Sequence, residues 1–228
     1  MNDLDTVRTT ILGTALPLAA ERGWTADVLA EAAASANIDA PLAARAFPRG
    51  AIDAVTEFHA WADRAMAGGL AEHDLTALRM RERVALAVRL RLEALVPHRE
   101  AARRALAVQV LPTNAAAAAA SVYATADAIW CALGDRAADF SFYSKRAMLA
   151  GVCAATFVAW LTDDSTDSAV TWAFLDRRIA EVMAFGAAKA KVTKAAGEAM
   201  ATLRRAVSRM LPPVWPDRPL GGRRARDR

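Results

Sequence analysis

The chain has 228 residues, of which 55% are hydrophobic, and it carries a formal net charge of +4. This length suffices for one well-buried domain, and the apolar content excludes general disorder. Alanine and leucine dominate, while β-branched and aromatic residues at alternating positions are scarce. The helical period therefore prevails over the strand period, and we predict an all-α fold.

The first part of the chain predicts short helices followed by a longer one. Gly23 ends the first helix, Thr25 can cap the second, Pro48 breaks the third and Gly50 opens the fourth. We expect these helices at about 4–22, 26–34, 40–47 and 50–68. The series resembles the helix-turn-helix head of TetR-type proteins, which implies a TetR-like helical bundle with this head at residues 1–70.

The predicted head is poorly suited to DNA. Between Met1 and Gly50, four arginines stand against six acidic residues. Phosphate neutralisation supplies much of the affinity for DNA, and a recognition helix needs polar side chains for base edges. The segment in that position, APLAARAF, offers only Arg45. We expect no nucleic-acid partner, and a TetR-type regulator that senses an apolar ligand is the alternative function.

The body, residues 71–188, predicts further helices at about 76–95, 98–111, 114–133, 141–161 and 165–185. Thr113 or Asn114 can cap the third of these. Its alanine run, Ala115–Ala120, permits either close helix packing or space for an apolar ligand. The uncharged run Ala147–Thr162 is 16 residues long, shorter than the roughly 20 that span a bilayer, and it predicts a core helix surrounded on all sides.

Catalytic motifs are absent from the sequence. The three histidines are far apart, and Cys131 and Cys153 form no CxxC pair, which suits a reducing compartment. No metal-binding, nucleotide-binding or nucleophile motif occurs. We predict a protein that is not an enzyme and has no metal or cofactor; a small hydrolase or lyase would need polar groups that converge in a cavity. The N-terminus lacks a secretory signal pattern, so we predict a cytoplasmic location.

Three segments carry a resemblance to a known family: ADAIWCALGD at 126–135, DFSFYSKRAMLAGV at 139–152 and TWAFLDRRI at 171–179. In the second, an aromatic pair follows an Asp-Phe step and precedes two basic residues. The chain here resembles the Coq-nine family, the lipid-binding accessory proteins of ubiquinone biosynthesis. The resemblance implies that the protein presents a membrane quinone intermediate to a late-acting hydroxylase.

By this resemblance, Asp139, Phe142, Tyr143 and Arg146 form the surface that binds the di-iron demethoxyubiquinone hydroxylase. Ile129 could add apolar area to the same surface. Phe142 stands where many relatives have Trp. Phe142 and Tyr143 point about 100° apart on a helix, so at least one should face solvent or a partner. Packing of these aromatic residues into the core is the alternative.

The family resemblance also implies a bound isoprenoid lipid or quinone precursor. Met148, Val152, Trp172 and Leu175 are the candidates to line its cavity, although a core and an apolar tunnel have the same composition. TetR-like proteins usually dimerise through their last two body helices, so a homodimer is implied as well.

The C-terminal segment is strongly basic. From Lys189 to Arg228, eleven Lys or Arg residues stand against three acidic ones. Residues 189–211 predict a basic amphipathic helix that binds an anionic membrane surface, and packing of this helix on the body is the alternative. Residues 212–228 predict a disordered basic tail. The expected location is therefore peripheral, on the inner face of the cytoplasmic membrane. The membrane-binding candidates are Lys194, Met200, Leu203, Arg204, Arg205, Val207, Arg209, Met210 and Leu211.

Overall fold

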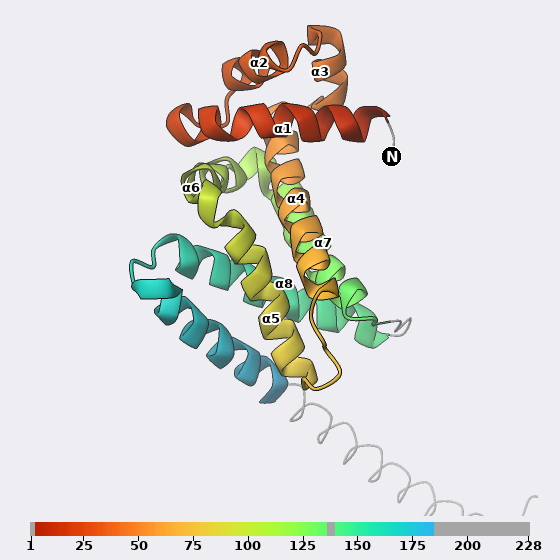
Figure 1. Cartoon of the computed structure of the whole chain (residues 1–228), viewed down its shortest axis with the longest axis vertical. Helices are drawn as coiled ribbons and strands as arrows, with labels where there is room; N and C mark the ends of the chain where they lie inside the picture. Colours follow the sequence, from red (N-terminus) through yellow and green to blue (C-terminus); the bar gives the residue numbers. More distant parts are fainter. Residues whose placement is uncertain (1–2, 136–139, 185–228) are drawn as a thin grey trace, which may run out of the picture. The chain divides into compact units, whose positions relative to one another are not determined.

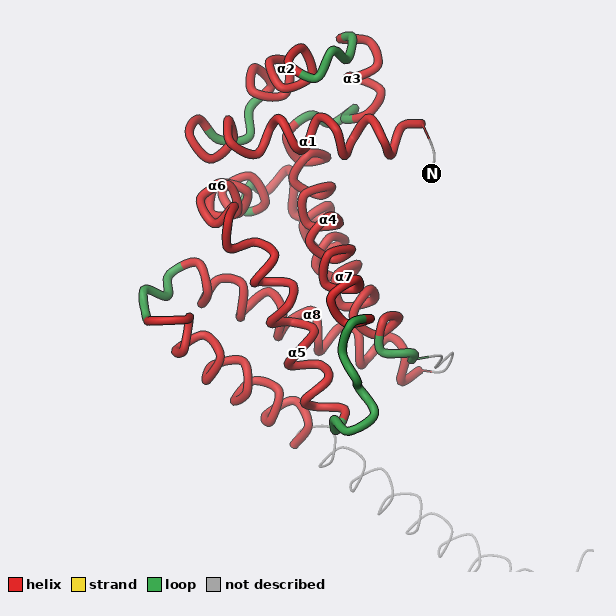
Figure 2. The backbone as a smooth tube through the Cα atoms, viewed as in Figure 1, coloured by secondary structure: helices red, strands yellow, loops and turns green. Residues whose placement is uncertain are grey.

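The computed structural model describes residues 3–135 and 140–184, and these residues form helices joined by short loops, with no strand among them (Figure 2). The predicted all-α fold is confirmed. An unlabelled helix spans residues 169–184. The labelled helices are α1 (Asp3–Arg22), α2 (Ala26–Ser35), α3 (Ala40–Ala46), α4 (Ala51–Ala71), α5 (Met80–Leu95), α6 (Arg99–Gln109), α7 (Ala115–Ala132) and α8 (Phe140–Leu161) (Figure 1).

Local signals set the starts of α2, α3 and α4. The Thr25 hydroxyl accepts a hydrogen bond from the Val28 N–H at 3.2 Å, as predicted, and the Asp39 carboxylate accepts one from the Leu42 N–H at 2.8 Å. Gly50 has a φ of +64°, a conformation that favours glycine, and opens α4. These local signals explain why the helices of the head were predicted to within a few residues.

Head and body belong to one compact unit, Met1–Val182, and Met183–Arg228 forms a second unit. Helix α4 begins in the head and continues through the body beside α5 and α7 (Figure 1). The Trp24 indole N–H donates to the Ala101 carbonyl at 2.9 Å and ties the head to α6. The predicted boundary at residue 70 falls at the C-terminal end of α4, the helix that runs from the head through the body.

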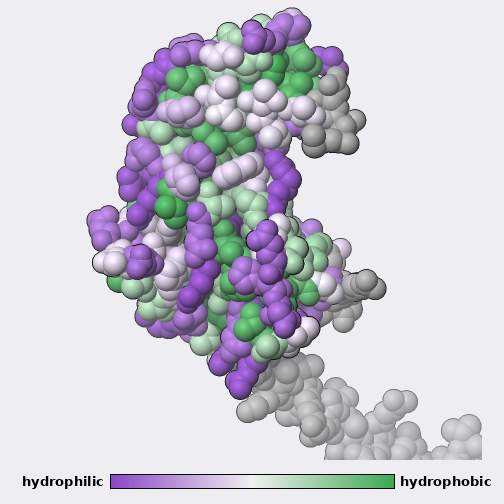
Figure 3. Space-filling view, viewed as in Figure 1, coloured by the Kyte–Doolittle hydropathy of each residue, from purple (hydrophilic) through white to green (hydrophobic). Residues whose placement is uncertain are grey.

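The core runs without interruption from the head into the body. Phe58, Met66, Leu92 and Leu95 are completely or almost completely buried, and each such side chain contributes about 1.5–3 kcal/mol through burial. On the face drawn in Figure 3, hydrophilic residues dominate and hydrophobic ones form smaller patches. This contrast between interior and surface is what the periodic apolar pattern predicts.

Helix α8 differs from the predicted helix that is surrounded on all sides. Its inner face, including Leu149 and Trp160, is buried, whereas Val158 is 47% exposed. Ala147 and Gly151 also lie on the exposed face. The prediction of complete burial was wrong, because neighbouring helices cover only one side of α8 within the described residues.

Helix α7 and the short turn before it, Pro112–Ala132, make the one described segment that is long and apolar enough to cross a membrane, by length and composition alone. Its alanines supply this hydropathy. The helix packs between α4 and α8, and it directs the buried Ser121 and Thr125 inward. These contacts make it a wall of the helical body.

One predicted helix start and one predicted capping bond were wrong. Helix α5 begins at Met80, not Thr76, because the Asp74 carboxylate accepts hydrogen bonds from the N–H and hydroxyl of Thr76 and holds a turn there. The Asn114 side chain does not cap α7; its amide donates to the Val108 carbonyl at 2.9 Å. In both cases a polar side chain formed a different local bond from the one expected.

Candidate ligand cavity

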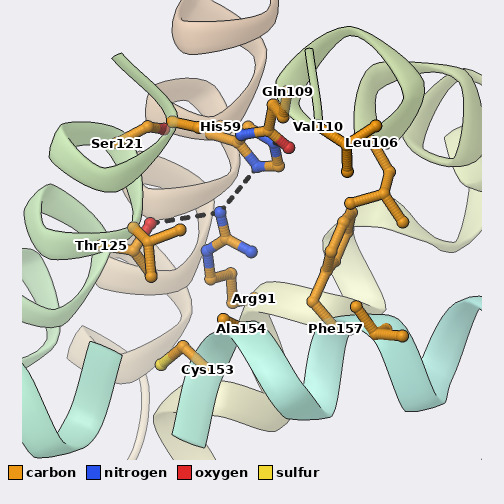
Figure 4. A pocket seen from close by; sticks show the side chains of 13 residues that line it. His59, Arg91, Leu106, Gln109, Val110, Ser121, Thr125, Cys153, Ala154 and Phe157 are labelled. Carbon is orange, nitrogen blue, oxygen red and sulfur yellow. Dashed lines mark hydrogen bonds between the residues drawn. The ribbon is translucent and has the colours of Figure 1, made fainter. Parts of the chain in front are cut away.

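A cavity of about 200 Å³ lies among α4, α5, α6, α7 and α8 (Figure 4). Each of these helices contributes side chains to its wall, and most of the wall is apolar. Ala118 on α7 leaves the space that the alanine run permitted. The lining residues are His59, Arg91, Leu106, Gln109, Val110, Ala118, Ser121, Val122, Thr125, Cys153, Ala154, Phe157 and Val158.

The cavity has an apolar rim. Val110, at the end of α6, and Val158, on α8, both line the cavity and are 68% and 47% exposed. Leu111, which follows Val110, is 49% exposed. Apolar side chains at an opening favour the entry of an apolar ligand over an ionic one, because ions lose their hydration on entry.

A buried ion pair stands behind the polar part of the wall. The Arg91 Nε atom donates to the Asp63 carboxylate at 2.5 Å, and the two side chains are 6% and 11% exposed. Arg91 also donates to Thr125 at 3.3 Å, and the Thr125 hydroxyl donates to Asp63 at 3.0 Å. These bonds join α4, α5 and α7, and they satisfy charges that would be costly to bury alone.

His59 extends this network to the cavity. Arg91 Nη2 lies 3.0 Å from His59 Nδ1, and because a guanidinium can only donate, Nδ1 must accept. The proton of the neutral ring therefore resides on Nε2, which donates to Gln109 Oε1 at 3.2 Å. Burial and the Arg91 charge lower the pKa of His59 to about 3, so the ring is neutral at pH 7. Figure 4 shows His59, Arg91 and Gln109 side by side on the wall.

This arrangement lacks the features of a nucleophilic catalytic site. Burial raises the pKa of the Cys153 thiol to about 12, so the reactive thiolate is scarce at pH 7. Ser121 forms no hydrogen bond with His59, whose Nδ1 is already occupied by Arg91. A histidine with so low a pKa is also a weak base. Within the described residues, no group of three or more His, Cys, Asp or Glu could hold a metal ion. The geometry of the cavity suits the binding of an apolar ligand.

None of the four predicted lipid-binding residues lines this cavity. Val152 and Leu175 are buried in the core, and Met148 is partly buried on α8. The Trp172 indole donates to the Asp167 carbonyl at 2.8 Å, and its ring lies 5.3 Å from the Arg89 guanidinium. The helix α8 residues that do reach the cavity lie farther along the helix, at 153–158.

The predicted partner-binding residues divide between surface and interior. Tyr143 is 64% exposed, whereas Ile129 is completely buried and Arg146 is 1% exposed. Arg146 forms ion pairs with Asp127 at 2.5 Å and with Asp135 at 3.4 Å.

The packing of α7 against α8 encloses Ile129 and Arg146, so Ile129 does not add apolar area to the exposed surface and Arg146 does not present its guanidinium there. Asp139 and the side chain of Phe142 lie outside the described residues. All of the predicted membrane-binding residues, Lys194 to Leu211, lie outside them too.

Ion pairs neutralise most of the arginines in the helix-turn-helix head. Arg49 pairs with Asp53 at 2.6 Å, Arg22 with Glu31 at 2.5 Å and Arg8 with Asp5 at 3.3 Å. Arg45 is exposed and has no ion pair among the described residues. One such cation gives little of the positive surface that DNA phosphates require.

Proteins with similar sequences carry COQ9 names. The chain is 33% identical over 200 residues to "Ubiquinone biosynthesis protein COQ9, mitochondrial" of Rattus norvegicus. The alignment covers 83% of this chain and 62% of the rat protein. It is 32% identical to the Homo sapiens protein of that name, covering 83% and 61%. It is 33% identical to COQ9-B of Xenopus laevis, covering 83% and 67%. The chain thus spans slightly under two thirds of the rat and human relatives.

A family model described as COQ9 matches residues 115–186, which include α7 and α8. Among solved structures, the chain is similar to the TetR transcriptional regulator from Nitrosomonas europaea ATCC 19718, with a TM-score of 0.62 and 23% identity. The match covers 78% of this chain and 98% of that one. This likeness confirms the predicted TetR-like fold.

One prediction about location was wrong. The relatives are named mitochondrial, which contradicts a cytoplasmic position on the inner face of the cytoplasmic membrane. The expectation rested on the absence of a secretory signal pattern. A secretory signal distinguishes secreted proteins from those that stay inside the cell, and it does not distinguish one internal compartment from another.

Proposed function

This chain belongs to the COQ9 family, and from that premise we propose that it is a lipid-binding accessory protein of ubiquinone biosynthesis that carries a membrane quinone intermediate to a late-acting hydroxylase. The observation that carries the proposal is the apolar cavity with its exposed rim at Val110 and Val158. The protein acts by binding and does no chemistry on its cargo. The low pKa of His59 and the high pKa of Cys153 support this part of the proposal.

The size of the cavity decides how a quinone would bind. Pockets that enclose a drug-sized ligand occupy about 300–1,000 Å³, and this one has about 200 Å³. It can take one end of a polyprenyl quinone, while the remainder of the lipid leaves over the apolar rim. Each CH₂ that stays out of water contributes about 0.8 kcal/mol, so a protein surface that replaces lipid contacts lowers the cost of extraction.

The cargo itself is tested by native mass spectrometry and lipid extraction of protein purified from a quinone-producing host. We expect an isoprenoid quinone or a precursor of one to co-purify. Filling the cavity by Ala118→Phe should reduce the bound lipid at least tenfold, and Ala173→Phe on the exposed part of helix 169–184 is the matched control. Protein that carries no lipid from such a host, and takes none up from vesicles, would contradict the proposal.

Membrane binding should depend on the basic segment that begins at Lys189. Each Lys or Arg near an anionic surface contributes about 1 kcal/mol, so we expect deletion of residues 189–228 to weaken binding to phosphatidylserine vesicles at least tenfold. The deletion leaves the unit Met1–Val182 whole. Vesicle co-sedimentation measures the effect, and thermal unfolding checks that the body stays folded. Equal vesicle binding by the two proteins would place the membrane contact elsewhere.

The exposed Tyr143 is our candidate anchor for the hydroxylase. Tyrosine is enriched among the side chains that dominate interface energies, and Tyr143 is 64% exposed. We expect Tyr143→Ala to weaken hydroxylase binding about tenfold or more while it changes the free energy of unfolding by less than about 1 kcal/mol. Surface plasmon resonance and urea denaturation measure the two quantities.

Met80→Ala, at a 44% exposed side chain on α5, is the matched control and should leave the affinity unchanged. A large loss of stability in Tyr143→Ala would instead assign this ring a packing role.

A further inference from the structure

The Gln109 amide is a hydrogen-bond donor on the cavity wall, and its orientation is set by His59 and Arg91. Arg91 can only donate, so His59 Nδ1 accepts; His59 Nε2–H then donates, so the carbonyl oxygen of the Gln109 amide accepts. The amide NH₂ group of Gln109 is left without a hydrogen-bond partner in the described part of the chain. The Gln109 side chain lines the cavity, and the residue is 9% exposed.

The electrostatics of the wall complement this donor. Arg91 and Asp63 cancel one another, His59 is neutral, and the other lining residues carry no charge at pH 7. In a cavity without net charge, no ion pair offsets the free energy of hydration that an anionic ligand loses on entry. A hydrocarbon, in turn, would bury the Gln109 amide without a hydrogen bond, which is unfavourable.

We infer that the cavity binds the head of a neutral lipid, and that the Gln109 amide donates a hydrogen bond to a carbonyl or ether oxygen of that head. Ser121, on α7, lines the same cavity and adds a hydroxyl to its wall (Figure 4). The inference rests on the proposed function and specifies which end of the lipid enters. A quinone ring meets these requirements, because its oxygens accept hydrogen bonds and it carries no charge. The tail then leaves past Val110 and Val158.

The test compares three probes that share one alkyl tail: decyl-benzoquinone, decylbenzene and decanoate. Quenching of tryptophan fluorescence or calorimetry gives each Kd for the full chain. We expect the quinone to bind about five- to tenfold more tightly than decylbenzene, since one hydrogen bond contributes about 1 kcal/mol net. Decanoate should bind more weakly than the quinone.

Two variants isolate the donor. Gln109→Leu removes the amide, and Gln109→Glu keeps an acceptor for His59 Nε2–H while it removes the donor. Both should abolish the preference for the quinone over decylbenzene, and decylbenzene affinity should stay within about twofold in Gln109→Leu. That retained affinity also shows that the variant is folded. Val122→Ala, at an apolar lining residue, is the control and should keep the preference for the quinone.

The outcomes separate the inference from the proposed function. If decylbenzene and the quinone bind equally to the unmodified protein, or if both Gln109 variants keep the preference, the head-group inference is overturned and the lipid-carrier proposal stands. Tighter binding of decanoate would overturn the inference as well. If no probe binds, the cavity is not a lipid site and both proposals fail.

Discussion

Replacing Arg91 with Met is expected to lower the free energy of unfolding by about 3–5 kcal/mol, because Asp63 would remain buried without its ionic partner. The pair is short and enclosed, with 2.5 Å between Nε and Oδ1 and with both side chains at least 89% buried. The change also removes the donors to His59 and Thr125. Urea denaturation followed by circular dichroism gives the midpoint and the slope for each protein.

Two further variants make this result interpretable. Arg64 pairs with Glu57 at 2.6 Å but is 55% exposed, so Arg64→Ala should cost no more than about 1 kcal/mol. The double variant Arg91→Met with Asp63→Leu replaces the whole ion pair by apolar side chains, and such replacements are often neutral. We expect it to recover most of the stability. A cost below about 1 kcal/mol for Arg91→Met alone would contradict a buried pair.

The helices were predictable because their signals are local. Thr25 caps α2 through a bond to a residue three positions away, and Gly50 takes up a conformation that few other residues adopt. Breakers such as Pro48 act on their immediate neighbours. Errors occurred where two local bonds compete, as at Thr76 and Asn114, since the sequence does not show which partner a short polar side chain selects.

The cavity depends on information of a different kind. Its wall combines residues from 59 to 158, and its volume is what remains after five helices have packed. No single helix encodes that volume. The predicted lining residues Val152 and Leu175 were apolar and periodic, as core residues also are, and the packing placed them in the core. The small residues on α7 were a usable signal for this volume, because they permit space, but they do not specify what fills it.

The buried ion pair of Arg91 and Asp63 could be anticipated in part from the sequence. Arg91 follows Val84 and Val88 at helical spacing on the buried face of α5, and Asp63 lies on the face of α4 that carries Phe58 and Met66. A charge within an apolar stripe predicts a buried partner, since an isolated buried charge is too costly. The spacing alone could not pair these two residues, because they are separated by 28 positions and lie on different helices.

Arg146 is also a charged residue within an apolar stripe, and we expect its replacement to have the second large effect on stability. Its position on α8 continues the stripe of Leu149, Cys153 and Trp160, and its side chain is 1% exposed. Arg146→Met should lower the free energy of unfolding by about 2–4 kcal/mol. The cost should be smaller than for Arg91, because the Asp127 side chain is 42% exposed and water can hydrate it once the guanidinium is gone.

The neighbouring Lys145 supplies the matched control. It pairs with Asp135 at 3.5 Å, but its side chain is 38% exposed, so Lys145→Met should cost no more than about 1 kcal/mol. Urea denaturation measures both variants, and equal costs would contradict the buried position of Arg146.

Hydroxylase affinity, measured without denaturant while Arg146→Met is still folded, then separates a packing role of Arg146 from a role in direct contact with the partner. Arg146 on α8 is buried and pairs with Asp127 on α7, whereas Tyr143 is exposed, so we expect the affinity to fall less in Arg146→Met than in Tyr143→Ala. A larger loss in folded Arg146→Met would mean that the guanidinium leaves its carboxylates to contact the partner directly.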